Sequence, residues 1–461
     1  MAYTPLTHHK LMSKMHLKLI PAAIIAVAPL AAQIGSAGIG GFGGPSILGR
    51  GTAAGGGRGG EAGMRFYAGV NANYDTGLTG FALDQNGKVQ NSGSQGLEGV
   101  AGVYGSKRSR RMLISLNYQG GYRHYRNISG FNGTDQNLSL SVSRQITSRR
   151  AIGVGANVGT TNRAFGLNNI SGFIDPNLIG FGAPTAEIFD NRIYYGSGSA
   201  NYIWQKSSRS SMSMGGNVFI TRRSGRVLFG ANGLSASADY AYRLSRNQAL
   251  SVSYNYMFFN FTRGFGDAHG HGVNAGYSVR VGRKYDFGIR AGGIRLESLF
   301  LQRVAVDPVI AAIVGVRETQ TVAHQVRYLP TASASLSGPL TRRSTVSVSA
   351  GLFVVPGNGV ITTAKNWNAG AGYGYTGIRR LGIGASFYYN KMTGLVGNTQ
   401  SFSSINGAGS LSTRVSGDIF VSFNGGMRSF LEGSTTNFQR RSYFASLGLF
   451  WSPGELPLNF R

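Results

Sequence analysis

The sequence predicts a single all-β domain, an antiparallel up-and-down β-barrel that spans a membrane. Three observations predict this fold: strands with one apolar and one small, polar face, short basic turns at regular intervals, and few charged residues overall. In a membrane barrel the apolar faces contact lipid and the polar faces line a wet interior.

Residues 250–258 show the alternation clearly. Their even positions are Leu, Val, Tyr, Tyr and Phe, and their odd positions are Ser, Ser, Asn and Met. Because successive side chains of a strand point to opposite faces, one face is apolar and the other small and polar. The same division occurs in residues 138–143, 346–352 and 381–390. Ser, Gly and Asn suit the interior of a membrane barrel, whereas the exposed face of a soluble sheet usually carries Lys and Glu.

Short basic turns divide the chain into hairpins. They lie near Arg108, Arg149, Arg209, Arg246, Arg283, Arg342, Arg379 and Arg414. Most intervals are 35–41 residues, which fits two membrane-spanning strands with one tight turn and one longer loop. With the opening and closing hairpins included, this spacing predicts about 18 strands. About 16 is the alternative, because strands such as the one near residues 96–104 are weakly marked.

Turn length predicts the orientation of the barrel. Bacterial barrels place short turns in the periplasm and longer loops outside the cell. We therefore expect the basic turns to be periplasmic and residues 127–136, 163–191, 264–272 and 297–323 to form extracellular loops. Aromatic pairs on the predicted lipid side are expected to form girdles at the membrane interfaces. These pairs are Tyr118/Tyr122, Tyr240/Tyr242, Tyr254/Tyr256, Tyr373/Tyr375 and Phe387/Tyr389.

The N-terminal residues 1–37 are predicted to be a secretory signal peptide. Three lysines precede an apolar stretch at residues 19–28, and small residues follow, with cleavage expected after residue 32 or 37. The alternative is a single N-terminal transmembrane helix. Residues 38–63 are rich in Gly and Ala and are expected to be flexible, and residues 64–461 are expected to form the barrel.

Composition and motifs argue against catalysis. Charged residues make up 13% of the chain, and the absence of Cys excludes thiol catalysis, zinc–thiolate sites and iron–sulfur clusters. The one candidate metal cluster is Asp267, His269 and His271, which we interpret as ordinary polar residues of a predicted loop. His124 and Asp239 fall on strands that the sequence cannot bring together. We predict no catalytic residues, no metal site and no cofactor.

Basic residues are the remaining signal, because 45 Lys and Arg face 17 Asp and Glu. Arg123, Arg280, Arg290 and Arg428 occupy the small, polar phase of strands, and an ionised guanidinium is costly on the lipid side. We predict that they line the pore among small or polar neighbours, as in pores that select anions. The basic turns are expected to contact anionic lipid headgroups. The export signal argues against a nucleic-acid partner.

The pattern over residues 64–461 resembles the outer-membrane β-barrel proteins of Gram-negative bacteria, the porin-like class. The resemblance implies the cell outer membrane as location, with outer-membrane lipid and the outer-membrane assembly machinery as partners. Many of these proteins end in a Phe or Trp that the assembly machinery reads. This chain ends in Leu458-Asn459-Phe460-Arg461, which departs from that pattern.

The predicted function is a passive, anion-preferring pore for small anionic solutes. A barrel of this size leaves a channel, and inward Ser, Gly and Asn would fill little of it. Residues 163–191 or 297–323 are expected to fold inward as a constriction. The first alternative is an export conduit for an acidic exopolysaccharide, since the chain resembles alginate-type exporters in charge and size. The second is a structural or adhesive surface barrel.

Overall fold

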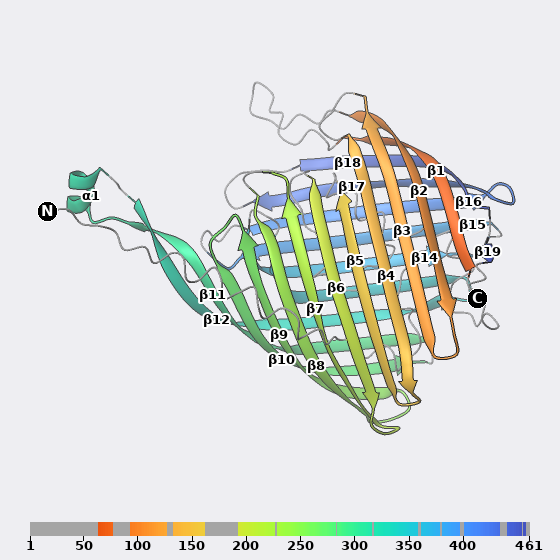
Figure 1. Cartoon of the computed structure of the whole chain (residues 1–461), viewed down its shortest axis with the longest axis horizontal. Coiled ribbons are helices and arrows are strands. Elements are labelled where there is room, and N and C mark those ends of the chain that lie inside the picture. The colour runs from red at the N-terminus through yellow and green to blue at the C-terminus, as the bar shows by residue number, and fades with distance from the viewer. Residues whose placement is uncertain are drawn as a thin grey trace.

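Eighteen antiparallel strands form one closed barrel in the computed structural model (Figure 1). Each strand pairs with its neighbours in sequence, and β18 pairs with β1 from Ala68↔Trp451 to Asp75↔Phe444, which closes the sheet. The prediction of an 18-stranded up-and-down barrel is therefore confirmed. The structure describes residues 63–457 except 77–92, 127–131, 162–191, 226–227, 283, 316–317, 358–360, 379, 397–400, 434–439 and 454. The expected signal peptide and nearly all of the flexible segment lie outside these residues.

The barrel strands are 12 to 24 residues long. They are β1 (Gly63–Asp75), β2 (Ser94–Arg108), β3 (Met112–Tyr125), β4 (Gly133–Thr147), β5 (Arg150–Thr161), β6 (Ile193–Gln205), β7 (Ser210–Arg223), β8 (Gly230–Arg243), β9 (Gln248–Thr262), β10 (Asp267–Val281), β11 (Tyr285–Ala305), β12 (Glu318–Thr341), β13 (Ser344–Pro356), β14 (Thr363–Tyr375), β15 (Leu381–Gly394), β16 (Ser401–Arg414), β17 (Ile419–Gly433) and β18 (Arg440–Trp451). A further short strand, β19 (Glu455–Pro457), pairs with the start of β1 and extends the closing seam.

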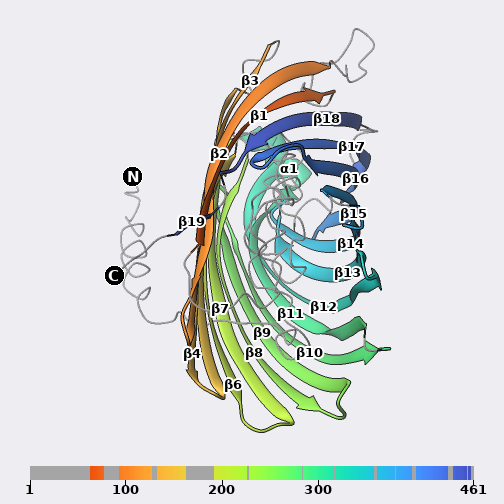
Figure 2. The same ribbon diagram turned by 90° about the vertical axis from the view of Figure 1, so that its right-hand side faces the viewer.

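Short turns join the strands at one end of the barrel, as the spacing of the basic residues predicts. We call this end the turn end and the opposite end, where the longer connections lie, the loop end. Loop length predicts that they are the periplasmic and extracellular ends, respectively. Figure 2 shows the first strands along one side of the barrel and β12–β18 along the other. The interior lies between these two walls.

The alternation of faces is confirmed. Within β9, Val252 is 56% exposed and points outward, whereas the next residue, Ser253, is 5% exposed and points inward. Every barrel strand places at least one large apolar side chain on the exposed outer face. Examples are Val70, Leu97, Tyr118, Leu138, Val154, Tyr194, Val218, Tyr240, Val252, Val273, Ile289, Val326, Val348, Trp367, Phe387, Leu411, Phe423 and Leu447. Because a closed barrel satisfies its backbone hydrogen bonds internally, an apolar exterior of this extent is suited to lipid.

Three of the predicted loops are shorter than expected, because strands extend into them. Residues 133–136 belong to β4 and residues 267–272 belong to β10. Most of the predicted loop 297–323 consists of the ends of β11 and β12. The predicted loop 163–191 lies almost entirely outside the described residues.

The ends of β11 and β12 form a two-stranded ribbon that projects beyond the barrel (Figure 1). A short helix, α1 (Pro308–Val314), lies at its tip, where the Asp307 side chain accepts a hydrogen bond from the Val309 backbone N–H at 2.8 Å. Ile313 of this helix is 79% exposed. The ribbon extends away from the interior, so the prediction that residues 297–323 constrict the pore is wrong.

Among the described residues, no helix has the length and apolar character needed to cross a membrane.

Cysteine labelling tests the orientation, since the native chain has no Cys. Ser208→Cys and Ser416→Cys place a thiol in exposed turns at the turn end, and Ala312→Cys places one on α1. Treatment of intact cells with an impermeant maleimide should label only Ala312→Cys, because loop length assigns the ribbon to the cell surface. Labelling of the two turn positions alone would reverse the orientation, and lysed cells provide the control for reactivity.

Candidate functional site: the barrel interior

Small, polar side chains line much of the inner wall. Asn117, Ser213, Ser253, Asn368 and Asn390 all face inward and are buried against neighbouring wall residues. The inward phase of these strands therefore has the composition that the sequence predicts. It is the phase of all four predicted pore-lining arginines.

Arg123 lies at the centre of a buried polar network near the loop end. Its guanidinium donates to Glu98 at 2.9 Å and also to Asp135. Glu98 accepts from the Asn73 amide at 3.1 Å, and Asp135 accepts from the Thr161 hydroxyl at 3.1 Å. Because Arg123 is directly opposite Glu98 in the β2–β3 register, the hairpin itself creates the first contact. This arginine is held by carboxylates rather than left free to attract solutes.

Arg428 forms an ion pair across the closing seam. Its guanidinium lies 3.7 Å from the Asp75 carboxylate, and the two side chains are 4% and 1% exposed. Arg428 belongs to β17 and Asp75 to β1, so the pair reaches over β18, where the guanidinium lies 4.6 Å from the Phe444 ring centroid. The pair therefore connects strands on both sides of the closing contact between β18 and β1.

The remaining predicted arginines also have carboxylate partners. Arg280 donates to Asp286 at 2.8 Å, directly opposite it in the β10–β11 hairpin. Arg290 lies 3.8 Å from Asp239 of β8, two strands beyond its own neighbour β10, and its side chain passes close to Gly276. The prediction that the neighbours of the four arginines are small or polar residues, and not paired acids, is therefore wrong. Only 17 acids are present in the chain, but several of them lie beside these arginines.

Sequence reasoning missed Arg327. It faces inward on β12, directly opposite Leu296, while its neighbours Val326 and Tyr328 are exposed on the outer face. Within the part of the chain that the structure describes, no carboxylate lies within ion-pair distance of Arg327. The sequence could have identified Arg327, because it lies between Val326 and Tyr328, whose large apolar side chains indicate the outward phase of the strand.

A buried apolar cluster fills part of the interior toward the loop end. It joins strands β7–β11 to β13 and to the residue that follows β15, and we call it the rim cluster. Its members are Phe219, Ala231, Phe259, Ala268, Ile294, Leu296, Val354 and Leu395. The interior is therefore apolar at this level, in contrast to the expectation that inward residues fill little space. The sequence contains one indication of this cluster. Met257 and Phe259 are large apolar residues in the inward phase of β9, where the earlier positions are Ser and Asn.

A second inward cluster lies at the closing seam toward the turn end. Tyr67, Val100, Tyr104, Phe420 and Phe450 pack together, with the Tyr67 and Tyr104 ring centroids 6.1 Å apart. These residues come from the first two and last two strands of the barrel. The seam is thus stabilised by aromatic packing at one level and by the Arg428–Asp75 pair at another.

The candidate metal residues lie on the outer face of β10, not in a loop. His269 and His271 point outward, and the His271 ring contacts the Tyr254 hydroxyl at 2.7 Å. His269 is 3.7 Å from Asp267. No group of three potential metal ligands occurs among the described residues. The structure also leaves His124 on the outer face and Asp239 on the inner face, so these two do not meet.

Comparison with known proteins gives distant structural likeness and nothing at the level of sequence. No family model matches the chain, and no curated protein matches it. OccK2 (OpdF) of Pseudomonas aeruginosa is 10% identical, with a TM-score of 0.41, over 86% of this chain and 98% of that one. The BenF-like porin of Pseudomonas fluorescens is 9% identical, with a TM-score of 0.42, over 86% and 99%.

OpdK of Pseudomonas aeruginosa, solved with vanillate, is 11% identical, with a TM-score of 0.40, over 85% of this chain and 98% of that one. Likeness this distant says nothing about solutes or mechanism, so the assignment depends on the barrel itself. The closed sheet, the apolar exterior and the polar inner wall define a β-barrel of the outer-membrane type, with porin-like architecture.

Proposed function

We propose that the protein is a passive channel for small solutes in the outer membrane. The observation that supports this function is a closed barrel of eighteen strands with a largely polar inner wall. Eight-stranded barrels are filled by their own side chains, whereas barrels of about 16–18 strands enclose an aqueous channel. The rim cluster narrows this channel toward the loop end and makes it selective for small molecules.

We infer an anion preference from the balance of charge along the inner wall. The four predicted pore-lining arginines remain part of this proposal, but their carboxylate partners neutralise most of their field. Arg327 contributes a positive charge with no such partner, next to the apolar rim cluster. Because apolar walls exclude water, a charge beside them acts more strongly on a passing ion.

Channel recordings test the pore and its selectivity together. The purified barrel in a planar bilayer should conduct and should prefer chloride to potassium, most clearly at low salt, since the Debye length is about 10 Å at 0.1 M. Arg327→Gln should reduce the preference, because it removes the inward positive charge and keeps a similar length. Arg222→Gln is the matched control, since Arg222 lies on the outer face and bonds Asn232 at 2.6 Å.

Arg280→Gln extends the test to a paired arginine. Arg280 and Asp286 are both partly exposed, so removal of the guanidinium leaves a carboxylate facing the interior. The variant should shift selectivity toward cations. A wild-type barrel without conductance would reject the channel proposal, whereas conductance with unchanged selectivity in both variants would reject only the anion preference.

A further inference from the structure

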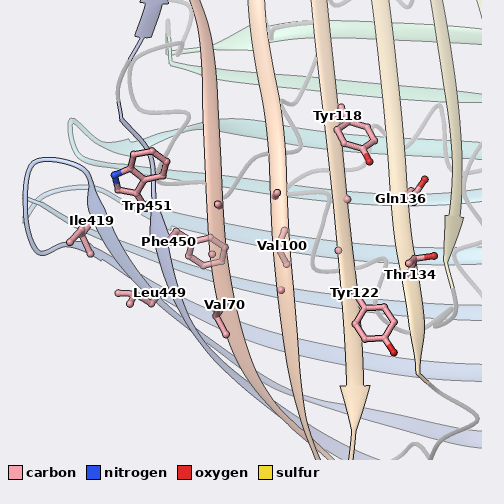
Figure 3. A pocket seen from close by; sticks show the side chains of 16 residues that line it. Val70, Val100, Tyr118, Tyr122, Thr134, Gln136, Ile419, Leu449, Phe450 and Trp451 are labelled. Carbon is pink, nitrogen blue, oxygen red and sulfur yellow. The ribbon is translucent and has the colours of Figure 1, made fainter.

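The lipid-facing exterior carries a groove across β17, β18 and β1–β4 (Figure 3). Its volume is about 780 Å³, which is within the range of small-molecule sites, about 300–1,000 Å³. Val70 and Leu449 stand beside it on one side, and Tyr118 and Tyr122 of β3 on the other. All four are exposed on the outer face of the barrel.

Small residues in register form the groove floor. Ala68, Ala101 and Gly120 are directly opposite one another on β1, β2 and β3, and Gly99 lies beside them on β2. The same row continues to Trp451 of β18 at one end and to Gln136 of β4 at the other. The hollow therefore results from one cross-strand row of small side chains between larger ones.

Packing within the protein does not require this hollow. A Cβ atom built on Gly99 would meet no other atom within 4 Å. Glycine inside a strand is destabilising and contributes no side-chain contact, yet Gly99 lies directly opposite Val70 on β1 and Tyr122 on β3. The small residues at this position keep a space on the lipid-facing surface that the barrel does not itself fill.

The dimensions and chemistry of the groove match a single hydrocarbon chain. Four strand spacings of about 4.8 Å give the row a length of about 19 Å. With strands tilted by about 35–45°, the row crosses about 11–14 Å of membrane depth, slightly less than half of a core about 30 Å thick. Apart from the hydroxyls of Tyr118 and Tyr122, the polar side chains of the lining lie toward β4, where Thr134 and Gln136 are found. These uncharged side chains can donate hydrogen bonds to an ester carbonyl.

We propose that this groove is a binding site for one ester-linked acyl chain of a membrane lipid, with the ester end of the chain at Thr134 and Gln136. The lipid-facing position selects this occupant, because the groove is continuous with the surface that already contacts hydrocarbon. A bound chain restores a smooth exterior across the closing seam of the barrel. The site is separate from the interior and does not depend on channel function.

Lipid retention after extraction tests the proposal. Wild-type protein incubated in detergent with phosphatidylethanolamine should keep one lipid through native mass spectrometry. Gly99→Leu combined with Ala101→Leu fills the floor and should lose that lipid. The matched control is Ala156→Leu with Ala275→Leu, which enlarges exposed outer-face residues on β5 and β10 and should retain it. Equal retention in all three proteins would refute the site.

The same spectra separate lipid from a second copy of the chain. Conversion of an oligomer to a monomer in the filled variant, with unchanged lipid retention, would assign the groove to a subunit contact and overturn the proposal.

Tryptophan quenching gives a second measurement that does not require the filled variant to fold. Trp451 lies at one end of the groove, and only Trp204 and Trp367 must be replaced by Phe to make it the single fluorophore. In vesicles with a small fraction of phosphatidylethanolamine carrying brominated chains, Trp451 should be quenched beyond the level expected from random mixing. A chain that keeps only Trp367, which is exposed on β14, should follow random mixing. Identical quenching of both would contradict the proposal.

Discussion

Val252→Arg is expected to destabilise the barrel by about 2–4 kcal/mol, the cost of a guanidinium on the lipid side near the membrane midplane. Val252 points outward and is 56% exposed on the outer face of β9. Ser253→Arg should cost clearly less, although it is only one residue further along. Its side chain points inward, where Asp239 is directly opposite it. The free energy of unfolding in lipid vesicles, from urea titration, measures both.

The comparison needs a control for size. Val252→Leu enlarges the same position without a charge and should leave the free energy of unfolding nearly unchanged, because lipid adapts to an apolar side chain. If Val252→Arg and Ser253→Arg were equally destabilising, the inward and outward assignment of β9 would be incorrect. Impaired assembly of Val252→Arg alone would agree with the assignment.

Asp75→Ala is expected to destabilise the barrel by about 3–5 kcal/mol, because it leaves the buried Arg428 guanidinium without its carboxylate. The pair lies 3.7 Å apart and is almost fully buried at the closing seam. Urea titration should show the loss, and the first strand should become sensitive to protease at lower urea concentrations. Asp135→Ala offers a comparison, since Arg123 retains Glu98 when Asp135 is removed.

An apolar double variant separates the pair from its individual charges. Asp75→Leu with Arg428→Met removes both ions, and such replacements of buried pairs are often neutral or stabilising. The double variant should therefore recover most of the stability that Asp75→Ala loses. A double variant as unstable as Asp75→Ala would indicate that the other contacts of these residues, rather than the ion pair, stabilise the seam.

The local part of the fold could be predicted because it depends on residues that are close together in the sequence. Alternation places Val252 outward and Ser253 inward whatever the rest of the chain does, and turn spacing gives the strand number. Residues 267–272 were misassigned because His269 and His271 are polar, yet they alternate with Ala268 and Gly270 as a strand requires. Composition suggested a loop where periodicity indicated a strand.

Long-range contacts in the interior were beyond such reasoning. The Arg280–Asp286 pair could have been found, because the two residues are symmetric about a short turn. The Arg290–Asp239 pair could not, since it depends on the register of four successive strands and on a small residue between the partners. The rim cluster likewise combines residues from β7 to β15, so its existence follows from the curvature of the closed sheet.

The closing seam has a consequence for the order in which the barrel forms. All strand pairings outside this seam join neighbours in sequence, but β1 meets β18 and β19 only after nearly the whole domain is available. The entropy of closing so long a loop must be overcome before these contacts form, which makes the last pairing the slow step. Until that step, both terminal strands present unpaired backbone edges that invite association with other chains. The buried ion pair and the aromatic cluster at the seam therefore form late in folding. They stabilise the closed barrel, in which these edges are no longer exposed.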